Sequence, residues 1–315
     1  MKETFLATLS PMLVMFFCMA IGFIANKLKL APDNTATVLS KLENYFFVPA
    51  LIINTFMKYC TVASVKEQYK LILYCLVALV LALAISLPLS RVFTKDTYTR
   101  QIYKYALTFG NFSFMGNAIV PAILGESALY QYMLFILPLN IMVYTWGLVI
   151  LIPHTSDKKH NVFKDLLNPI FISIIIGALL GLFDLAKYLP SFITSTLTNC
   201  AGCMGPLAMI LTGFCIGGYE IKKLLNNGRV YIATFLRLLV LPSLFIGVLM
   251  LLGAQKDVLF LTLFAFATPL GLNTVVFPAA YGGDTSTGAS MAMISHSLCI
   301  VTIPLLFAVL TAITA

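Results

Sequence analysis

The chain has 315 residues, of which 60% are hydrophobic and 10% are charged, and its mean hydropathy is +0.96. A soluble domain has about 25% charged residues on average, so this chain has too few charges to cover a water-facing surface. The formal net charge of +8 would on its own suggest a nucleic-acid partner. The composition instead indicates that lipid solvates most of the chain, and we expect no nucleic-acid partner.

Seven stretches contain no Asp, Glu, Lys or Arg and are long enough to cross a bilayer, which takes about 20 mostly apolar helical residues. In chain order they are residues 4–26, 71–90, 105–125, 127–156, 188–219, 258–283 and 285–315. Three more stretches come close to the same standard, at residues 38–57, 166–183 and 229–252. The sequence therefore predicts an all-α polytopic membrane protein with ten transmembrane helices. The first stretch has no clear cleavage site, so we expect a membrane helix there and not a signal peptide.

The distribution of basic residues predicts the orientation of these helices. With the N-terminus outside, the odd-numbered loops and their margins hold 12 Lys and Arg residues, against 6 on the other side. Loops rich in Lys and Arg face the cytoplasm. We therefore expect a multi-pass protein of the cell (inner) membrane with both termini outside.

The longest polar stretch, residues 154–165, predicts a cytoplasmic linker between residues 1–153 and residues 166–315. A shift of 157 residues places Pro49 on Pro206 and Pro121 on Pro278, in similar surroundings. With five helices in each half, the two halves have opposite orientations, as in many secondary transporters. We interpret the chain as two inverted five-helix repeats. An ordinary central loop and a chance coincidence of prolines are the alternatives.

The fourth and ninth predicted helices are interrupted at matching places. Residues 110–121 and 268–278 combine Gly, Asn and Pro at membrane depth, where irregular backbone must be enclosed by protein or a water-filled cavity. We expect the two breaks to face each other inside the protein, with Asn117 as the N-cap of one half-helix and Asn273 with Thr274 capping the other. Pro121 leaves a carbonyl without its helical partner.

Two half-helix N-termini that meet in the membrane would favour an anion, because each exposes N–H groups and a partial positive charge. The sequence thus predicts a carboxylate site without a buried Lys or Arg. The alternative is that the breaks are kinks used for packing. Asn140 in the fifth helix could line the site or form a hydrogen bond between helices.

Few ionisable residues lie inside the predicted helices. His296 could carry a proton or be a hydrogen-bonded structural residue. Glu43 is the acidic residue nearest to mid-membrane, so we do not expect a paired-carboxylate antiporter. The sequence has no Walker A, HExxH or GxSxG motif, and a metal site, a cofactor and an enzymatic activity are not expected. The pairs Gly177 with Gly181 and Gly213 with Gly217 predict close helix packing.

Two motifs carry a resemblance to a known family. GNFSFMGNAIVPAILG at residues 110–125 and ATPLGLNTVVFPAAYGGD at residues 267–284 resemble the auxin efflux carrier family, which includes plant auxin exporters and bacterial malate and malonate permeases. The resemblance implies a fold similar to that of sodium/proton antiporters, with crossing broken helices four and nine. It implies that the substrate carboxylate is held by Asn111, Asn117, Pro121, Asn273 and Pro278, to which we add Thr274 and Asn140 as candidate binding residues.

The function that we expect is secondary transport of small organic anions, mono- or dicarboxylates, by alternating access. Protons or sodium ions are candidate coupling ions, and uniport is the third option. The runner-up hypothesis is a gated anion channel or passive pore, and a membrane enzyme or sensor ranks last. We expect membrane lipid to surround the protein. A homodimer is one assembly that the sequence allows.

Overall fold

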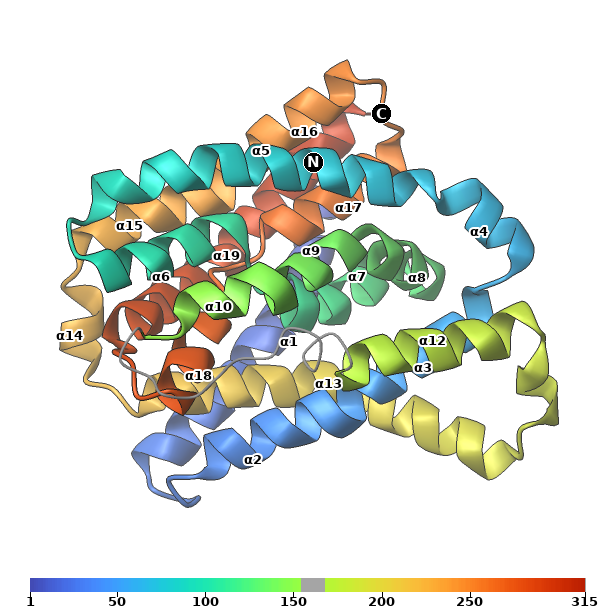
Figure 1. The fold of residues 1–315 in the computed structure, drawn as a ribbon, viewed down its shortest axis with the longest axis horizontal. Coiled ribbons are helices and arrows are strands. Elements are labelled where there is room, and N and C mark those ends of the chain that lie inside the picture. Colours follow the sequence, from blue (N-terminus) through green and yellow to red (C-terminus); the bar gives the residue numbers. More distant parts are fainter. Residues whose placement is uncertain (154–167, 315) are drawn as a thin grey trace.

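A computed structural model describes residues 1–153 and 168–314 (Figure 1). In these two ranges every regular element is a helix, and the β structure there consists of one isolated antiparallel bridge between Gly110 and Leu270. The all-helical fold that the composition predicts is confirmed. The linker expected at residues 154–165 lies outside the described residues.

The described part of the first half of the chain, residues 1–153, contains short helices joined into longer ones. In chain order they are α1 (Lys2–Lys27), α2 (Thr35–Leu42), η1 (Glu43–Phe47), α3 (Val48–Tyr59), α4 (Val62–Gln68), α5 (Lys70–Phe93), α6 (Thr97–Thr108), η2 (Phe112–Gly116), α7 (Asn117–Leu124), α8 (Glu126–Phe135), α9 (Leu137–Met142), η3 (Val143–Gly147) and α10 (Leu148–Leu151). The segments η1 and η3 are π-helical turns inside longer helices, and η2 is a π-helical turn at the start of one. Such turns are frequent at functional sites.

The second half is built in the same way. Its described helices are α12 (Pro169–Leu182), η4 (Leu185–Tyr188), α13 (Ser191–Gly217), α14 (Ile221–Leu225), α15 (Gly228–Phe235), η5 (Leu236–Val240), α16 (Leu241–Leu251), α17 (Lys256–Phe266), α18 (Asn273–Ala280) and α19 (Ser286–Ile313). Here η4 is a 3₁₀ turn and η5 is a further π-helical turn, which continues from α15 into α16.

Six continuous helices among the described residues are long and apolar enough to cross a membrane, and a seventh crossing results when α8 and the α9–α10 helix, bent by 46°, are taken as one span. Three stretches in which the sequence predicts a span are shorter or interrupted. Helix α12 has 14 residues, and residues 105–125 and 258–283 each contain a break. The chain is therefore a multi-pass membrane protein, and the count of ten stays a prediction.

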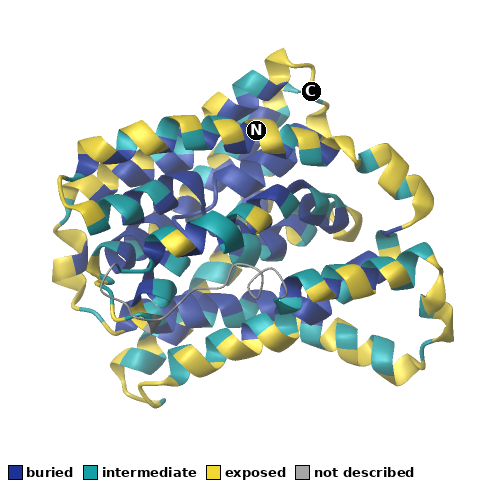
Figure 2. Cartoon of the chain, viewed as in Figure 1, coloured by how far each residue is buried: buried dark blue, intermediate teal, exposed yellow. Residues whose placement is uncertain are grey.

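The outer helices carry many of the exposed residues (Figure 2), and a large share of these residues are apolar. Phe17, Val80, Phe192 and Leu251 are among them, and Leu251 is 89% exposed. A water-soluble monomer seldom exposes contiguous apolar surface on this scale. The buried residues gather in α17 and in the second half of α13 (Figure 2), so these segments form the core of the protein while lipid contacts the outer helices.

Small residues allow two pairs of helices to pack closely across the halves. Helix α1 packs along α13, and α12 packs along α3. A methyl group on Gly213 would overlap the carbonyl oxygen of Met19, and one on Gly181 would lie 2.5 Å from the carbonyl oxygen of Cys60. The close packing predicted for the two glycine pairs is confirmed, since Gly177 meets α3 and Gly217 meets α1 in the same way.

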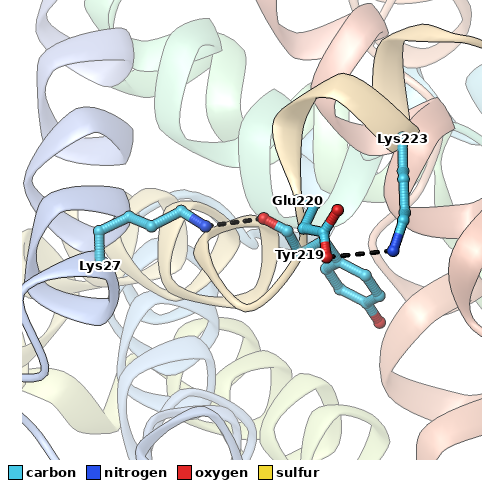
Figure 3. A network of polar contacts seen from close by, with 4 residues as sticks. All are labelled: Lys27, Tyr219, Glu220 and Lys223. Atoms are coloured by element: carbon cyan, nitrogen blue, oxygen red, sulfur yellow. Dashed lines mark hydrogen bonds and ion pairs between the residues drawn. The ribbon is translucent and has the colours of Figure 1, made fainter.

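One hydrogen bond joins the ends of α1 and α13, and an ion pair lies close to it at the start of α14 (Figure 3). Lys27, the last residue of α1, donates a hydrogen bond from Nζ to the carbonyl oxygen of Tyr219, just beyond α13, at 2.7 Å. Lys223 forms an exposed ion pair with Glu220 at 3.0 Å. A cation beside the last carbonyls of a helix is favourable, so Lys27 fixes the register of the two helices at this end.

Candidate functional site

Two interrupted helices cross at the centre of the fold. The first consists of α6 and the η2–α7 helix, separated by residues 109–111, and the second consists of α17 and α18, separated by residues 267–272. At each break the C-terminus of one helix and the N-terminus of the next converge. The breaks fall within the Gly-, Asn- and Pro-containing segments in which the sequence predicts them.

The two breaks contact each other directly. Gly110 and Leu270 form the antiparallel bridge, and the backbone N–H of Asn111 donates to the carbonyl oxygen of Pro269 at 2.7 Å. The expectation that the breaks face each other inside the protein is thus confirmed. Pairing with the other break satisfies backbone groups that a helix would otherwise satisfy, as backbone at membrane depth requires.

Side chains from neighbouring helices hold the crossing in place. The hydroxyl of Ser295 in α19 accepts a hydrogen bond from the backbone N–H of Leu270 at 3.0 Å. The hydroxyl of Tyr132 in α8 lies 2.8 Å from the carbonyl oxygen of Phe112 and 3.3 Å from that of Phe264. Tyr132 therefore links the start of one half-helix to the end of the opposite one, and the crossing is rigidly supported from two sides.

The first half-helix begins earlier than the sequence predicts. Asn117 is not its N-cap, because η2 starts at Phe112 with Asn111 in the cap position. The carbonyl oxygen of Asn111 accepts from the backbone N–H groups of Met115 and Gly116 at 2.9 and 3.3 Å. The π-helical turn adds one helical turn before Asn117, and this turn is the physical reason for the difference. The positive end of the helix dipole lies at Phe112.

The second half-helix begins at Asn273, where the sequence predicts it. Neither Asn273 nor Thr274 caps it through the side chain in the expected manner. The hydroxyl of Thr274 donates back to the carbonyl oxygen of Gly271 at 2.9 Å, and the side chain of Asn273 donates to the hydroxyl of Tyr105 at 2.7 Å. Asn273 is therefore fixed by a residue of α6, in the opposite half of the chain.

The crossing forms one wall of a cavity of about 610 Å³. The lining residues come from the two breaks and the half-helices that follow them, from α2 with η1, from α9 with η3, and from the start of α12. They include Ser40, Lys41, Asn44, Asn111, Ser113, Asn140, Asn168, Gly271 and Asn273. Small-molecule sites have volumes of about 300–1,000 Å³. The cavity contains amide and hydroxyl groups together with the starts of both half-helices.

The structure brings three of the predicted site residues together in the cavity wall, namely Asn111, Asn140 and Asn273. The other candidates lie behind the wall. Asn117 and Thr274 are buried at 3% and 0% exposure in the first turns of α7 and α18, and Pro121 and Pro278 lie farther along the same helices. These four support the half-helices and do not line the cavity.

His296 also lies behind the wall, in α19, where it is 3% exposed. Its Nδ1 is 2.7 Å from the carbonyl oxygen of Ala292, and its Nε2 is 3.1 Å from Nδ2 of Asn111. A carbonyl only accepts, so Nδ1 carries the proton and Nε2 accepts from the Asn111 amide. Both ring nitrogens therefore form hydrogen bonds. This arrangement matches a hydrogen-bonded structural residue, one of the two roles that the sequence allows for His296.

Arg237 is the residue that the sequence analysis missed. It lies in η5, it is 0% exposed, and its guanidinium nitrogens have no hydrogen-bond partner among the described residues. The guanidinium stacks on the ring of Phe266 with its carbon 5.6 Å from the ring centroid. A methyl group on Gly110 would lie 2.6 Å from Arg237 Nη2. Since Gly110 also lines the cavity, the buried cation lies directly behind the cavity wall.

The sequence predicts an anion site without a buried Lys or Arg, whereas the structure places a buried arginine beside the predicted site. The signal was present in the sequence as a single arginine inside the apolar stretch 229–252. Ionisable residues in membrane helices are rare and face the protein interior. Arg237 lies beside the last residue of α17 and just beyond the end of α6, where helix dipoles place partial negative charge that offsets part of the cost of burying its charge.

Near the start of α6, outside the membrane-spanning segments, Asp96 caps the helix. Its Oδ2 accepts the backbone N–H of Thr99 at 2.7 Å, and this hydrogen bond lowers the pKa of the Asp96 carboxyl. The carboxylate at the N-terminus also complements the helix dipole. The helix that leads into the crossing thus has a charged N-cap.

The geometry defines the class of protein: a multi-pass membrane protein whose two interrupted helices cross beside a cavity lined by apolar side chains and several amide groups. The sequence profile of a family described as membrane transport protein matches residues 7–307, nearly the whole chain. The chain therefore belongs to this membrane transport protein family, the auxin efflux carrier family. No match to a curated protein was found. The family is one of transporters, and the resemblance of the two motifs at the breaks is confirmed.

Proposed function

We propose that the protein is a secondary transporter that moves small organic anions, mono- or dicarboxylates of the malate or auxin type, across the cell membrane by alternating access. The observation that carries the proposal is the antiparallel contact of the two helix breaks, Gly110 with Leu270, in the wall of a 610 Å³ cavity. Transporters with discontinuous helices bind their substrates at such breaks.

The proposed architecture is ten spans in two inverted repeats, residues 1–153 and 166–315. Two interrupted helices among the described residues supply spans four and nine, and α12 supplies span six. The packing supports this division. The first span, α1, packs on the seventh, α13, and the sixth span, α12, packs on the second, which contains α3. Each half thus packs its first span against the second span of the other half. The bridge between the two breaks has the same exchange symmetry.

An anion is the favoured ligand because three kinds of positive group converge on the cavity. The η2–α7 helix and α18 begin at its wall, at Phe112 and Asn273. Arg237 lies directly behind Gly110, and Lys41 is part of the lining. Helix N-termini and buried cations are strong in a low-dielectric interior. Asn111 and Asn140 add hydrogen-bonding groups that orient a carboxylate.

The proposal includes a multi-pass protein of the inner membrane with both termini outside, as the basic loops predict. Alternating access would move the crossing against the remaining helices and expose the cavity to each side in turn. The candidate binding residues are Asn111, Asn140 and Asn273, with Asn117, Thr274 and the two prolines shaping the half-helices. Coupling to protons or sodium and a homodimer remain part of the hypothesis.

The test is uptake by purified protein in liposomes, with a panel of radiolabelled carboxylates under imposed pH, sodium and voltage gradients. Asn111→Ala and Asn273→Ala should each lower uptake about 10- to 100-fold, since a hydrogen bond to a charged group contributes about 1.5–3 kcal/mol. The matched control is Asn54→Ala. Asn54 is a buried amide in α3 that accepts from the Thr198 hydroxyl at 3.3 Å and lies outside the cavity lining.

Uptake at wild-type rates by both cavity variants would contradict the site. Saturable, slow uptake without unitary currents in planar bilayers distinguishes a transporter from the runner-up hypothesis, a gated anion channel or pore. Discrete unitary conductance would favour the channel.

A further inference from the structure

We propose that Glu43 is the proton-carrying residue of this transporter, which takes up a proton when a carboxylate enters the cavity and releases it when the carboxylate leaves. The proposal rests on the proposed function, and it names the coupling ion and the residue that binds it. Glu43 is a group that the binding site described above does not use.

The side chain of Glu43 is buried in the protein, although its neighbours in the sequence line the cavity. Glu43 is the first residue of the π-helical turn η1, and it is 0% exposed. Ser40, Lys41, Asn44 and Tyr45, within one helical turn on either side, all line the cavity. Glu43 itself does not, so its side chain points from this turn into the protein, where η1 packs against α12 and α13.

Both carboxyl oxygens of Glu43 lack a hydrogen-bond partner in the described part of the chain. An ionised carboxylate that is buried and unpaired is very unfavourable, and such a group becomes neutral by binding a proton. The structure therefore corresponds to a state in which Glu43 holds a proton. A movement that exposes η1 to water would solvate the carboxylate, and Glu43 would then release its proton.

No basic side chain offers Glu43 a salt bridge from the helices packed against η1. Lys41 in α2 is exposed, and Lys58 and Tyr59 lie roughly 20 Å farther along the same continuous helix, at about 1.5 Å per residue. Helix α12 has no ionisable residue. Helix α13 has only the cysteines at positions 200, 203 and 215.

The sign of the coupling follows from electrostatics. An anion in the cavity adds negative charge beside η1, and a nearby like charge favours the neutral form of a carboxyl. Anion binding therefore increases the proton affinity of Glu43, and protonation increases the affinity for the anion by the same factor. The step is a simple proton transfer, in which a carboxylate oxygen gains one proton from water on one side and returns it on the other.

A proton suits this position better than a metal ion. Hard cations take about six oxygen ligands, whereas Glu43 offers two, and the described residues contain no group of three or more His, Cys, Asp and Glu side chains that could hold a metal. His296 is a poorer carrier than Glu43, because both of its ring nitrogens form hydrogen bonds. Protonation of Nε2 would break its contact with Asn111.

The first arm of the test does not depend on any substrate. Dicyclohexylcarbodiimide reacts with protonated carboxyl groups in apolar surroundings. We expect it to label Glu43 at neutral pH, detected as a mass increase on the peptide that contains this residue. The Glu43→Gln protein should lose the label, and the exposed Glu126 should remain unlabelled. Absence of label on Glu43 in the wild type would overturn the proposal.

The second arm measures accumulation of radiolabelled malonate in liposomes at zero membrane voltage. An inward proton gradient of one pH unit should support about a tenfold accumulation when one proton accompanies each anion. Glu43→Gln should abolish this accumulation and retain malonate counterflow, while Glu126→Gln, the matched control, should accumulate like the wild type. Gradient-driven accumulation by Glu43→Gln would overturn the proposal. Absence of uptake of any carboxylate by the wild type would instead contradict the proposed function.

Discussion

The side chain of Asn111 donates from Nδ2 to Nε2 of His296 at 3.1 Å, across 185 positions in the sequence. Asn273 at the other break forms an equivalent hydrogen bond, from its side chain to the hydroxyl of Tyr105 at 2.7 Å. Each asparagine at a helix break is thus held from behind by a residue from the opposite half of the chain. The amides of Asn111 and Asn273 are therefore fixed in orientation before any ligand enters.

The contact to Asn111 predicts a positioning role for His296. In His296→Leu the Asn111 amide loses its partner, and a buried hydrogen-bonding group left unpaired costs about 1–3 kcal/mol. We therefore expect KM for carboxylate uptake to rise about 5- to 150-fold. His296→Gln, which can accept from Asn111 at similar reach, should recover most of the affinity and should remain driven by a pH gradient. Loss of gradient-driven uptake in His296→Gln would assign the proton to His296.

A second prediction concerns Arg237. The Arg237→Met variant keeps an apolar stem beside Phe266 and removes the charge behind Gly110. We expect uptake of carboxylates to fall about tenfold or more, since about 1.4 kcal/mol of lost attraction suffices. Thermal stability should stay unchanged or rise, because a buried cation without a hydrogen-bonding partner among the described residues is destabilising.

Uptake kinetics and the apparent Tm of the purified Arg237→Met protein check this combination. A fall in Tm together with unchanged uptake by the remaining folded protein would mean that Arg237 stabilises the fold and does not act on the anion.

The close approach at Gly110 gives a third prediction. A methyl group there would lie 2.6 Å from Thr268 Oγ1 and 2.8 Å from the carbonyl oxygen of Thr268. Gly110→Ala should therefore push the two breaks apart, lower stability by about 1–3 kcal/mol as overpacking does, and abolish uptake. Gly202→Ala in α13 is the matched control, since nothing lies within 4 Å of its added methyl group. Normal uptake by Gly110→Ala would show that the contact between the breaks is dispensable.

The N-cap of α6 gives a prediction for pH. The pKa of Asp96 is lowered in the folded protein by its hydrogen bond from the Thr99 backbone. Its stabilising contribution is present above the unfolded pKa of about 3.9 and is lost as pH falls through the folded pKa. Asp96→Asn keeps a cap without the charge, so the apparent Tm of the wild type should fall more steeply below about pH 4 than that of the variant. Parallel curves would exclude the contribution.

The sequence is sufficient to locate the breaks but not to define their geometry. Gly110 and Pro269 lie inside long apolar stretches and disfavour a continuous helix there, so both helix breaks can be predicted from the sequence. The sequence predicts the start of the first half-helix at Asn117, five residues too late, because the π-helical turn at Phe112 depends on contacts with Tyr132 and the opposite break.

Burial of charged residues was the other feature that the sequence could not decide. Glu43 and Arg237 both lie in π-helical turns inside apolar helices. Such residues face away from lipid, but whether one faces the cavity or packed protein depends on the rotation of its helix about its own axis, which packing against other helices sets. For the same reason the cavity residues of α2 and α12, such as Lys41 and Ile170, could not be assigned from spacing alone.

The central claim is that the two crossing helix breaks bind a carboxylate. Its most direct test is equilibrium binding of radiolabelled carboxylates to purified protein, compared between the wild type, Asn111→Ala, Asn273→Ala and the Asn54→Ala control. The account predicts saturable binding by the wild type and by Asn54→Ala, and affinity reduced at least about tenfold in the other two variants. Wild-type affinity in both Asn111→Ala and Asn273→Ala would contradict it.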